Sequence, residues 1–138
     1  MTKKVPEWMY RQLAVIPYRF GADGLEVLLI TSRKRKRWVL PKGVVEPGMT
    51  PADSAEKEAF EEAGIEGRVD DRPLGSYQYR KWGGTCTVEV FAMRVTGESD
   101  DWPEAEIRTR AWTPPAEASG RVDEAELKEL ITSLPEQV

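Results

Sequence analysis

The chain has 138 residues, of which 40% are hydrophobic and 32% are charged, a balance typical of a folded globular protein. It contains no histidine, which excludes serine or cysteine hydrolysis that relies on imidazole and a zinc site with histidine ligands. The net charge of −4 argues against stable nucleic-acid binding, and no apolar run is long enough to cross a membrane.

The length and the cysteine content indicate the number of domains and the cellular compartment of the protein. We expect one domain over residues 1–138, as a monomer or a homodimer. Cys86 is the lone cysteine and has no partner for an internal disulfide, while residues 1–12 lack the apolar stretch of a signal peptide. These features predict a protein of the reducing cytoplasm.

The first third of the chain predicts strands. Residues 11–18 and 25–31 are rich in β-forming residues and are separated by a glycine turn. The near-continuous apolar run of 25–31 predicts a strand that is buried on both faces. The basic run 33–37 follows as a loop, and a short strand at 38–40 leads into a loop that contains glycine.

The next element is an acidic helix with clear signals at both ends. Thr50 is placed to cap its N-terminus, Pro51 suits the first helical position, and Asp53 completes a capping box. Gly64 suits the left-handed residue that ends a helix. A stripe of small residues, which would let the helix lie close to a sheet, contains Ala52, Ala55, Ala59 and Ala63.

The rest of the chain predicts a hairpin, a further strand and a helical end. In chain order we expect strands at 74–81 and 85–95, a strand at 107–112, a helical turn over 113–118, and a helix that has Asp123 as its N-cap, Glu126 in its capping box and Pro135 as its end. Strands joined mostly by hairpins, with helices between them, predict an α/β fold with a mixed sheet covered by helices on both sides.

The acidic helix offers the most concentrated set of oxygen ligands in the chain. Glu58, Glu61 and Glu62 lie within an arc of about 100° on one helical face. Most such clusters are solvated surface, but like charges at this spacing repel, so that a compensating cation is attractive. Hard carboxylate oxygens suit Mg²⁺ or Mn²⁺, and carbonyls of the loop around Gly43 can add ligands. The nearby Lys42 and basic run 33–37 would hold phosphate charge.

The same stretch resembles the Nudix box. In that pattern a glycine, five residues, a glutamate and seven residues precede Arg-Glu, an aliphatic residue, any residue, Glu-Glu, any residue, glycine and an aliphatic residue. The positions in register are Gly43, Glu58, Glu61, Glu62, Gly64 and Ile65. The resemblance extends along nearly the whole chain and implies the α/β/α sandwich of the Nudix family.

The resemblance also implies roles for these residues. Glu58, Glu61 and Glu62 would bind Mg²⁺ or Mn²⁺, with the Gly43 carbonyl as a further ligand, and Glu58 or Glu61 would orient or deprotonate the attacking water. The implied reaction is hydrolysis of a diphosphate linkage in a nucleoside diphosphate linked to another group. The physics agrees, because such metals neutralise charge on the transferred phosphoryl group.

Two positions depart from the Nudix box. Met49 stands where the pattern has its first glutamate, and Lys57 stands where it has arginine. In the family these two residues support the metal-binding carboxylates. Their joint replacement is either a compensated change, because neither charge is left alone, or a weaker support for the metal site.

Outside the box, the chain resembles the diphosphoinositol polyphosphate and diadenosine polyphosphate phosphohydrolase branch. The likeness lies in Arg33 placed five residues before Trp38, in WVLPKG, and in DWPEAEIRTRAWTPPAEA. It implies a polyphosphate or nucleotide substrate held by Arg11, Ser32, Arg33 and Lys42, with Lys34 and Arg35 as further candidates. The alternatives are another Nudix activity, on an RNA 5′ end or a damaged nucleotide, and a binding module without turnover.

Two assignments stay open at the level of sequence. The family commonly uses one more acid near the metal, and the candidates here are Glu89, Glu104 and Glu106. Aromatic residues could stack a nucleobase, although aromatic strand residues more often belong to the core. The aromatic candidates are Tyr77, Tyr79, Trp82 and Phe91.

Overall fold

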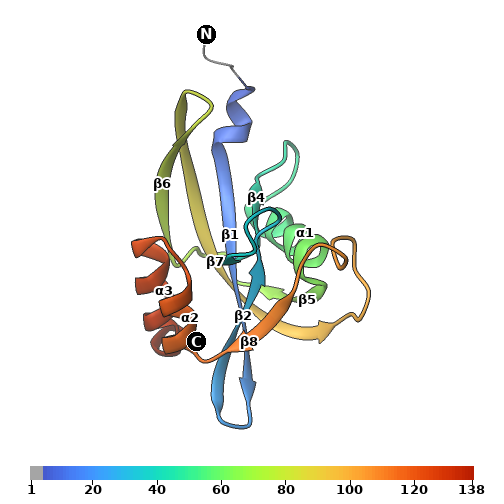
Figure 1. Cartoon of the computed structure of the whole chain (residues 1–138). Helices are drawn as coiled ribbons and strands as arrows, with labels where there is room; N and C mark the ends of the chain where they lie inside the picture. The colour runs from blue at the N-terminus through green and yellow to red at the C-terminus, as the bar shows by residue number, and fades with distance from the viewer. Residues whose placement is uncertain (1–4) are drawn as a thin grey trace.

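An eight-stranded mixed sheet with a helix on one face and two on the other forms the structure, a computed structural model that describes residues 5–138 (Figure 1). The strands are β1 Arg11–Gly21, β2 Gly24–Thr31, β3 Trp38–Val39, β4 Lys42–Val44, β5 Ile65–Val69, β6 Gly75–Lys81, β7 Gly84–Glu98 and β8 Arg110–Thr113. The helices are the 3-10 helix η1 Glu7–Tyr10 and the α-helices α1 Pro51–Ala63, α2 Pro115–Arg121 and α3 Ala125–Gln137. The predicted α/β class with a mixed, helix-covered sheet is confirmed.

Residues 1–4, which belong to the stretch 1–12 of the signal-peptide prediction, lie outside the described residues. Within residues 5–138, none of the helices has the length and apolar character needed to span a lipid bilayer.

Strand β1 organises the sheet because it pairs with three strands. It runs parallel to β7, and its two halves pair antiparallel with β4 and β2. Strand β7 pairs in turn with β6 and β5. The sheet path is β3-β2-β1-β7-β5, with β4, β6 and β8 attached to its sides.

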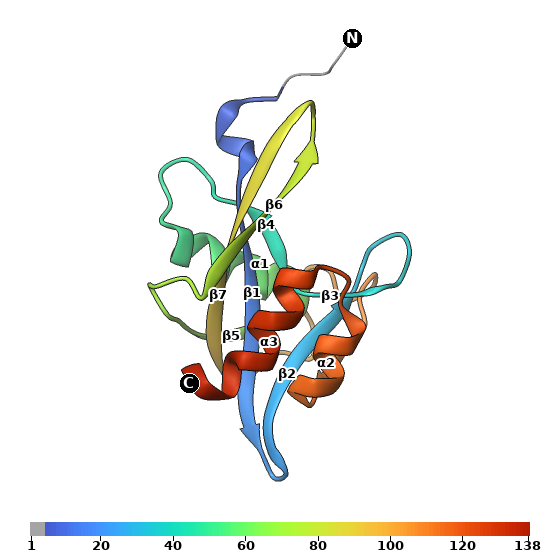
Figure 2. The ribbon, with the colours of Figure 1, turned by 90° about the vertical axis from the view of Figure 1, so that its left-hand side faces the viewer.

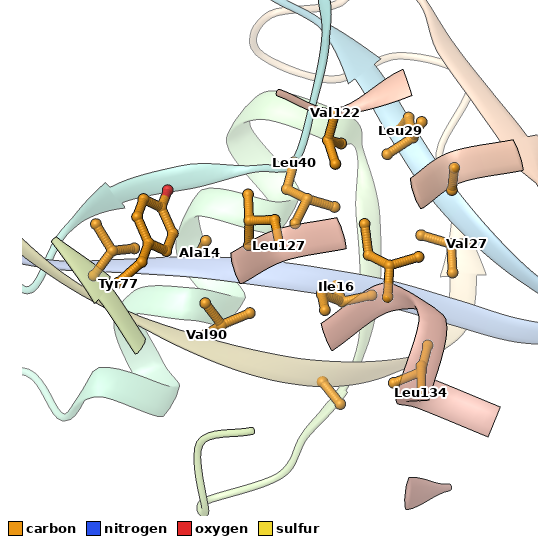
Figure 3. Close-up of a cluster of buried hydrophobic side chains, with 14 residues drawn as sticks. Ala14, Ile16, Val27, Leu29, Leu40, Tyr77, Val90, Val122, Leu127 and Leu134 are labelled. Atoms are coloured by element: carbon orange, nitrogen blue, oxygen red, sulfur yellow. The ribbon is translucent and has the colours of Figure 1, made fainter. Parts of the chain in front are cut away.

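Alternation along β1 divides the core into two layers. Leu13 and Val15 point to the face that α1 covers, whereas Ala14 and Ile16 point to the face that α2 and α3 cover (Figure 2). In the first layer the predicted small-residue stripe packs on the sheet, and Ala55, Ala59 and Ala63 are fully buried. The second layer contains Leu40, Tyr77 and Leu127, which Figure 3 shows together.

The signals at the ends of α1 are confirmed. The Thr50 hydroxyl accepts a hydrogen bond from the Asp53 N–H at 3.0 Å, and Pro51 is the first helical residue. Gly64 ends the helix in the left-handed conformation with φ of 66°. The hairpin is also confirmed as β6 and β7, and Val27 to Ile30 of β2 are fully buried as its apolar run predicts.

Several predicted boundaries were wrong. Two strands were missed: Lys42–Val44 pairs with β1, and Ile65–Val69 pairs with β7. The strand predicted at 107–112 begins only at Arg110, because Arg108 turns inward and the Thr109 N–H bonds the Thr31 hydroxyl at 2.9 Å. The helical turn predicted at 113–118 is α2, Pro115–Arg121.

The predicted ends of the last helix were also wrong. Glu124 occupies the N-cap position of α3 and makes no side-chain cap. The Asp123 carboxylate accepts a 2.6 Å hydrogen bond from Arg37 instead, which removes it from a capping role. Pro135 lies inside the last turn of α3, where only one backbone bond is lost before the helix ends.

Candidate active site

Two of the three candidate metal-binding glutamates of α1, Glu58 and Glu62, converge at the edge of the sheet. Glu62 is only 8% exposed, and its carboxyl group shares a hydrogen bond with that of Glu58. Burial raises the pKa of both groups, and for Glu62 the hydrogen bond and the charge of Glu58 act in the same direction. A bound cation would favour the charged forms of both carboxyl groups, which burial disfavours.

Gly43 lies directly against this pair. A Cβ atom built at Gly43 would lie 2.4 Å from the Glu58 carboxyl carbon, so that only glycine leaves room for the carboxylate. Gly43 pairs with Leu13 of β1, and Leu13 pairs on its other side with Glu89 of β7. Directly opposed strand residues share a face, which places Gly43 and Glu89 on the side of the sheet that α1 covers.

Arg108 approaches the pair from the segment before β8. Its side chain is 8% exposed, and its guanidinium lies 3.6 Å from Glu62 Oε1 and 2.9 Å from Glu104 Oε1. It also donates to the Thr31 carbonyl at 3.0 Å. The Lys42 N–H donates to Glu62 Oε1 at 3.2 Å. These contacts fix the Glu62 carboxyl group from two sides.

Residues 102–110, which lead into the start of β8, also complete the C-terminal end of α1. The backbone N–H of Glu104 donates to the Glu61 carbonyl, the indole of Trp102 to the Glu62 carbonyl, and Arg110 to the Ala63 carbonyl. The last carbonyls of a helix lack intrahelical donors, and a cation there is favoured by the helix dipole. Residues 102–110 therefore support the end of α1 that carries Glu61 and Glu62.

Glu61 lies beside a lysine of the same helix. Lys57 Nζ lies 3.9 Å from Glu61 Oε1 and 2.7 Å from Glu46 Oε1. Glu46 belongs to the loop between β4 and α1, and its N–H reaches the Ser54 hydroxyl at 3.4 Å. The lysine that replaces the box arginine is thus ion-paired, while Met49 has no charge to offer it.

The residues fit a divalent cation at Glu58 and Glu62. Within residues 5–138, no three Asp, Glu or Cys side chains are grouped closely enough to hold a metal ion by themselves. Mg²⁺ does not require such a group, because it keeps several waters and commonly uses one or two carboxylates plus substrate phosphates. The buried Glu62 and the half-buried Glu58, both with raised pKa values and packed on a glycine with no space for a side chain, are such a donor set.

A cavity opens on the opposite face of the sheet, next to Glu62. It has a volume of about 260 Å³, and its walls are Ala14, Arg37, Val39, Leu40, Lys42, Glu62, Tyr77, Arg108, Glu124 and Leu127. Figure 3 shows Ala14, Leu40, Tyr77 and Leu127 side by side in this layer. Its floor is apolar and its rim is charged, and Glu62 connects it to the carboxyl pair.

Lys42 is one of three cationic side chains at the rim of this cavity, with Arg37 and Arg108. Its ammonium donates to the Tyr79 hydroxyl at 3.0 Å and lies 4.2 Å from the centre of that ring. The Tyr79 hydroxyl donates in turn to Gln12 at 2.6 Å. Burial lowers the pKa of Lys42, an effect that the nearby Glu124 and Glu62 carboxylates oppose.

The four residues predicted to hold substrate are dispersed around the site. Lys42 lines the cavity, whereas Arg11 lies on the α1 side with its guanidinium 3.6 Å from Glu89. Ser32 accepts a hydrogen bond from the Arg37 N–H and shapes the basic loop. Arg33 is exposed on this loop, which projects beside β3 in Figure 2.

The structure shows where the candidates for the additional acid and for the stacking aromatic residue lie. Of the three further acids, Glu89 shares a row and a face with Gly43, and Glu104 reaches Glu62 only through Arg108. Phe91 is a core residue at 2% exposure. Tyr77 belongs to the core and also lines the cavity.

Sequence reasoning missed two participants, Arg108 and Glu46. The sequence places Arg108 in the predicted strand 107–112, and only the fold shows its guanidinium turned toward Glu62. Glu46 lies three residues before Met49, and an acid so close to a missing acid was a signal available in the sequence.

Replacing Glu62 by Gln tests the raised pKa in metal-free protein. A raised folded-state pKa gives stability that is present below the ordinary carboxyl value of 4.5 and is lost as the pH rises toward about 9. Glutamine mimics the protonated acid at every pH. The melting temperature of Glu62→Gln, relative to that of the wild type, should therefore increase by a few degrees as the pH rises through this range. A difference that stays constant with pH, measured by thermal unfolding in chelator, would contradict the assignment.

Comparisons with known proteins place these observations among relatives. A model of the NUDIX domain matches residues 10–134. Nudix hydrolase 12, mitochondrial, from Arabidopsis thaliana is 39% identical over 102 residues, which cover 68% of this chain and 50% of the relative. Diphosphoinositol polyphosphate phosphohydrolase 3-beta from Bos taurus is 31% identical over 109 residues, or 78% of this chain and 65% of the relative.

Solved structures show the same fold. The crystal structure of a C. elegans Ap4A hydrolase binary complex superposes with a TM-score of 0.76 at 24% identity, over 91% of this chain and 94% of the other. The matched regions span between 50% and 62% of the length of the first four relatives.

Proposed function

Because the chain belongs to the Nudix family, we propose that it is a metal-dependent hydrolase that cleaves a diphosphate linkage in a small polyphosphorylated substrate. The observation that carries this proposal is the Glu58–Glu62 pair, with Glu62 buried and Glu58 half-buried, packed against Gly43. When bound, Mg²⁺ or Mn²⁺ would draw charge from the phosphate oxygens and position the linkage.

The residues of the chain would divide the remaining work. Glu58, Glu61 and Glu62, with the Gly43 carbonyl, would hold the cation, while Glu58 or Glu61 would orient the attacking water and accept its proton. Glu89 is the best-placed additional acid, because it shares the face and row of Gly43. Arg108 would keep Glu62 in place, and Lys42 would neutralise phosphate charge at the rim of the cavity.

The cavity supports a dinucleoside polyphosphate as the substrate. Its apolar floor and the Tyr77 ring suit the flat face of a nucleobase, and its volume of about 260 Å³ is large enough for one. Its rim is not a purely cationic surface, because Glu62 and Glu124 line it together with Arg37, Lys42 and Arg108. Such a mixed rim favours a polar organic group over a cluster of phosphates.

A second candidate, a diphosphoinositol polyphosphate, is favoured by the relative from Bos taurus that carries this substrate in its name. The exposed Arg33, Lys34 and Arg35 support either candidate, because both substrates carry a chain or cluster of phosphates beyond the scissile bond. We further propose a single domain that works in the cytoplasm as a monomer or homodimer without stable nucleic-acid binding.

A screen of Mg²⁺- and Mn²⁺-dependent phosphate release tests these candidates directly. Dinucleoside polyphosphates, diphosphoinositol polyphosphates, RNA with a 5′ triphosphate and oxidised nucleotides form its panel. We expect turnover of the first class to exceed the others. If nothing in the panel is hydrolysed while a polyphosphate still raises the melting temperature, the chain is a binding module and the hydrolase proposal fails.

Neutralising two residues of the basic loop tests substrate binding. The variant Arg33→Gln/Arg35→Gln should raise the KM for a polyphosphate about tenfold, because a charged hydrogen bond of about 1.4 kcal/mol corresponds to that factor. The KM for a simple nucleotide sugar should change much less. Arg68→Gln/Arg72→Gln is the matched control, since these exposed arginines lie on β5 and the loop after it. Equal effects on both substrates would remove the role of the loop.

A further inference from the structure

The loop that connects Gly43 to α1 is fastened to the helix through Glu46. The Glu46 N–H donates to the Ser54 hydroxyl at 3.4 Å, and its carboxylate lies 2.7 Å from Lys57 Nζ. Ser54 and Lys57 are neighbours on α1 because residues three apart share a helical face. The Glu46 carbonyl also accepts the Met49 N–H at 3.1 Å, which closes a turn over 46–49.

Lys57 lies between this loop carboxylate and a candidate metal-binding carboxylate. Its ammonium is 2.7 Å from Glu46 Oε1 but 3.9 Å from Glu61 Oε1. A lysine side chain is long and flexible, so that without Glu46 the ammonium would turn to Glu61, four residues along the same helix. A lysine paired directly with Glu61 would compete with a cation for that carboxylate.

The Glu46–Lys57 ion pair provides a pair of opposite charges in place of the two residues in which this chain departs from the Nudix box. The pattern places a glutamate at position 49 and an arginine at position 57, where this chain has Met49 and Lys57. Glu46 lies three residues before Met49, and the turn over 46–49 brings its carboxylate to Lys57. The charge pair is therefore present, with its acid three residues before the box position.

We propose that Glu46 replaces the missing box glutamate and is a positioning residue that holds Lys57 away from Glu61, leaving Glu61 available to the divalent cation. This inference rests on the proposed metal-dependent function. It concerns residues that do not touch substrate, and it assigns the altered box to a compensated change rather than to a degenerate site.

Metal binding without substrate provides the test. The readout is the Mg²⁺ concentration that gives half of the maximal rise in melting temperature. Glu46→Gln should require about tenfold more Mg²⁺, the lower end of the effect of groups that orient metal ligands. Glu56→Gln, which removes a charge from the exposed residue next to Lys57, should leave the requirement unchanged. Adding Met49→Glu to Glu46→Gln should restore most of the affinity.

The outcomes separate this inference from the proposed function. A wild-type protein that Mg²⁺ and Mn²⁺ do not stabilise would overturn the metal-dependent function and the inference with it. A wild-type response that Glu46→Gln and Glu56→Gln change equally would overturn the inference alone. So would a double variant that binds Mg²⁺ no better than Glu46→Gln. A purely structural role of Glu46 would lower the metal-free melting temperature and leave the Mg²⁺ requirement unchanged.

Discussion

Replacing Glu62 by Gln is expected to reduce metal-dependent turnover by about three orders of magnitude while the fold stays intact. A cation at this site is worth several kcal/mol of transition-state stabilisation, and each 1.4 kcal/mol is a factor of ten in rate. Glutamine keeps the size of the side chain and its contacts with Arg108 and the Lys42 N–H. Because the pKa of Glu62 is raised, the metal-free fold already accommodates an uncharged group there.

Steady-state turnover with saturating Mg²⁺ and thermal unfolding of the same sample measure the two parts of this result. Glu56→Gln is the matched control, since residue 56 is exposed and lies on the other side of α1 from Glu58. Glu61→Gln should also reduce turnover strongly. Substantial remaining activity in both the Glu61 and Glu62 variants would contradict the assignment of the metal-binding carboxylates.

Gly43→Ala is expected to lower turnover about 100-fold with a small change in stability. The added Cβ would overlap the Glu58 carboxyl group, which is the mobile end of a side chain and can move away without disturbing the backbone. A displacement of this kind near a reacting centre costs about two orders of magnitude. The φ angle of Gly43 is not positive, so that the backbone itself accepts alanine.

The control for this variant is Gly97→Ala, because a Cβ at Gly97 meets no atom within 4 Å and its φ angle is not positive. We expect Gly97→Ala to keep full activity. Thermal unfolding distinguishes a displaced Glu58 from a disturbed fold. A Gly43→Ala variant with wild-type turnover would remove the argument that glycine is required there for the carboxylate.

The parts of the fold that sequence predicted well depend on local signals. Helix α1 carries a capping threonine, a proline at its first position and a glycine at its end, and each acts on backbone groups within a few residues. Its small-residue stripe and its acidic face follow from helical periodicity alone. The candidate carboxylates of the site could therefore be named before the structure was known.

The parts that sequence did not predict depend on distant partners. Asp123 is a good capping residue in isolation, but Arg37, 86 positions earlier, takes its carboxylate. Arg108 and Glu62 are 46 positions apart and meet only because α1 and the segment before β8 pack together. The choice of Glu89 over Glu104 and Glu106 as the additional acid near the metal depends on strand register, which aligns Glu89 with Gly43. Local patterns contain no information on such pairings.

Strand β4 has only three residues, yet its alternation places two adjacent residues, Lys42 and Gly43, on opposite faces of the sheet, where they have different roles. Gly43 faces the carboxyl pair and Lys42 faces the cavity, because successive strand residues point to opposite faces. A single-residue insertion between Leu40 and Lys42 that shifts this pairing would exchange the two faces and disable both at once. Changes of length in the basic loop 32–37 would leave the pairing of β4 untouched. Related chains should accordingly vary freely in length before Trp38 and hardly at all between Leu40 and Gly43.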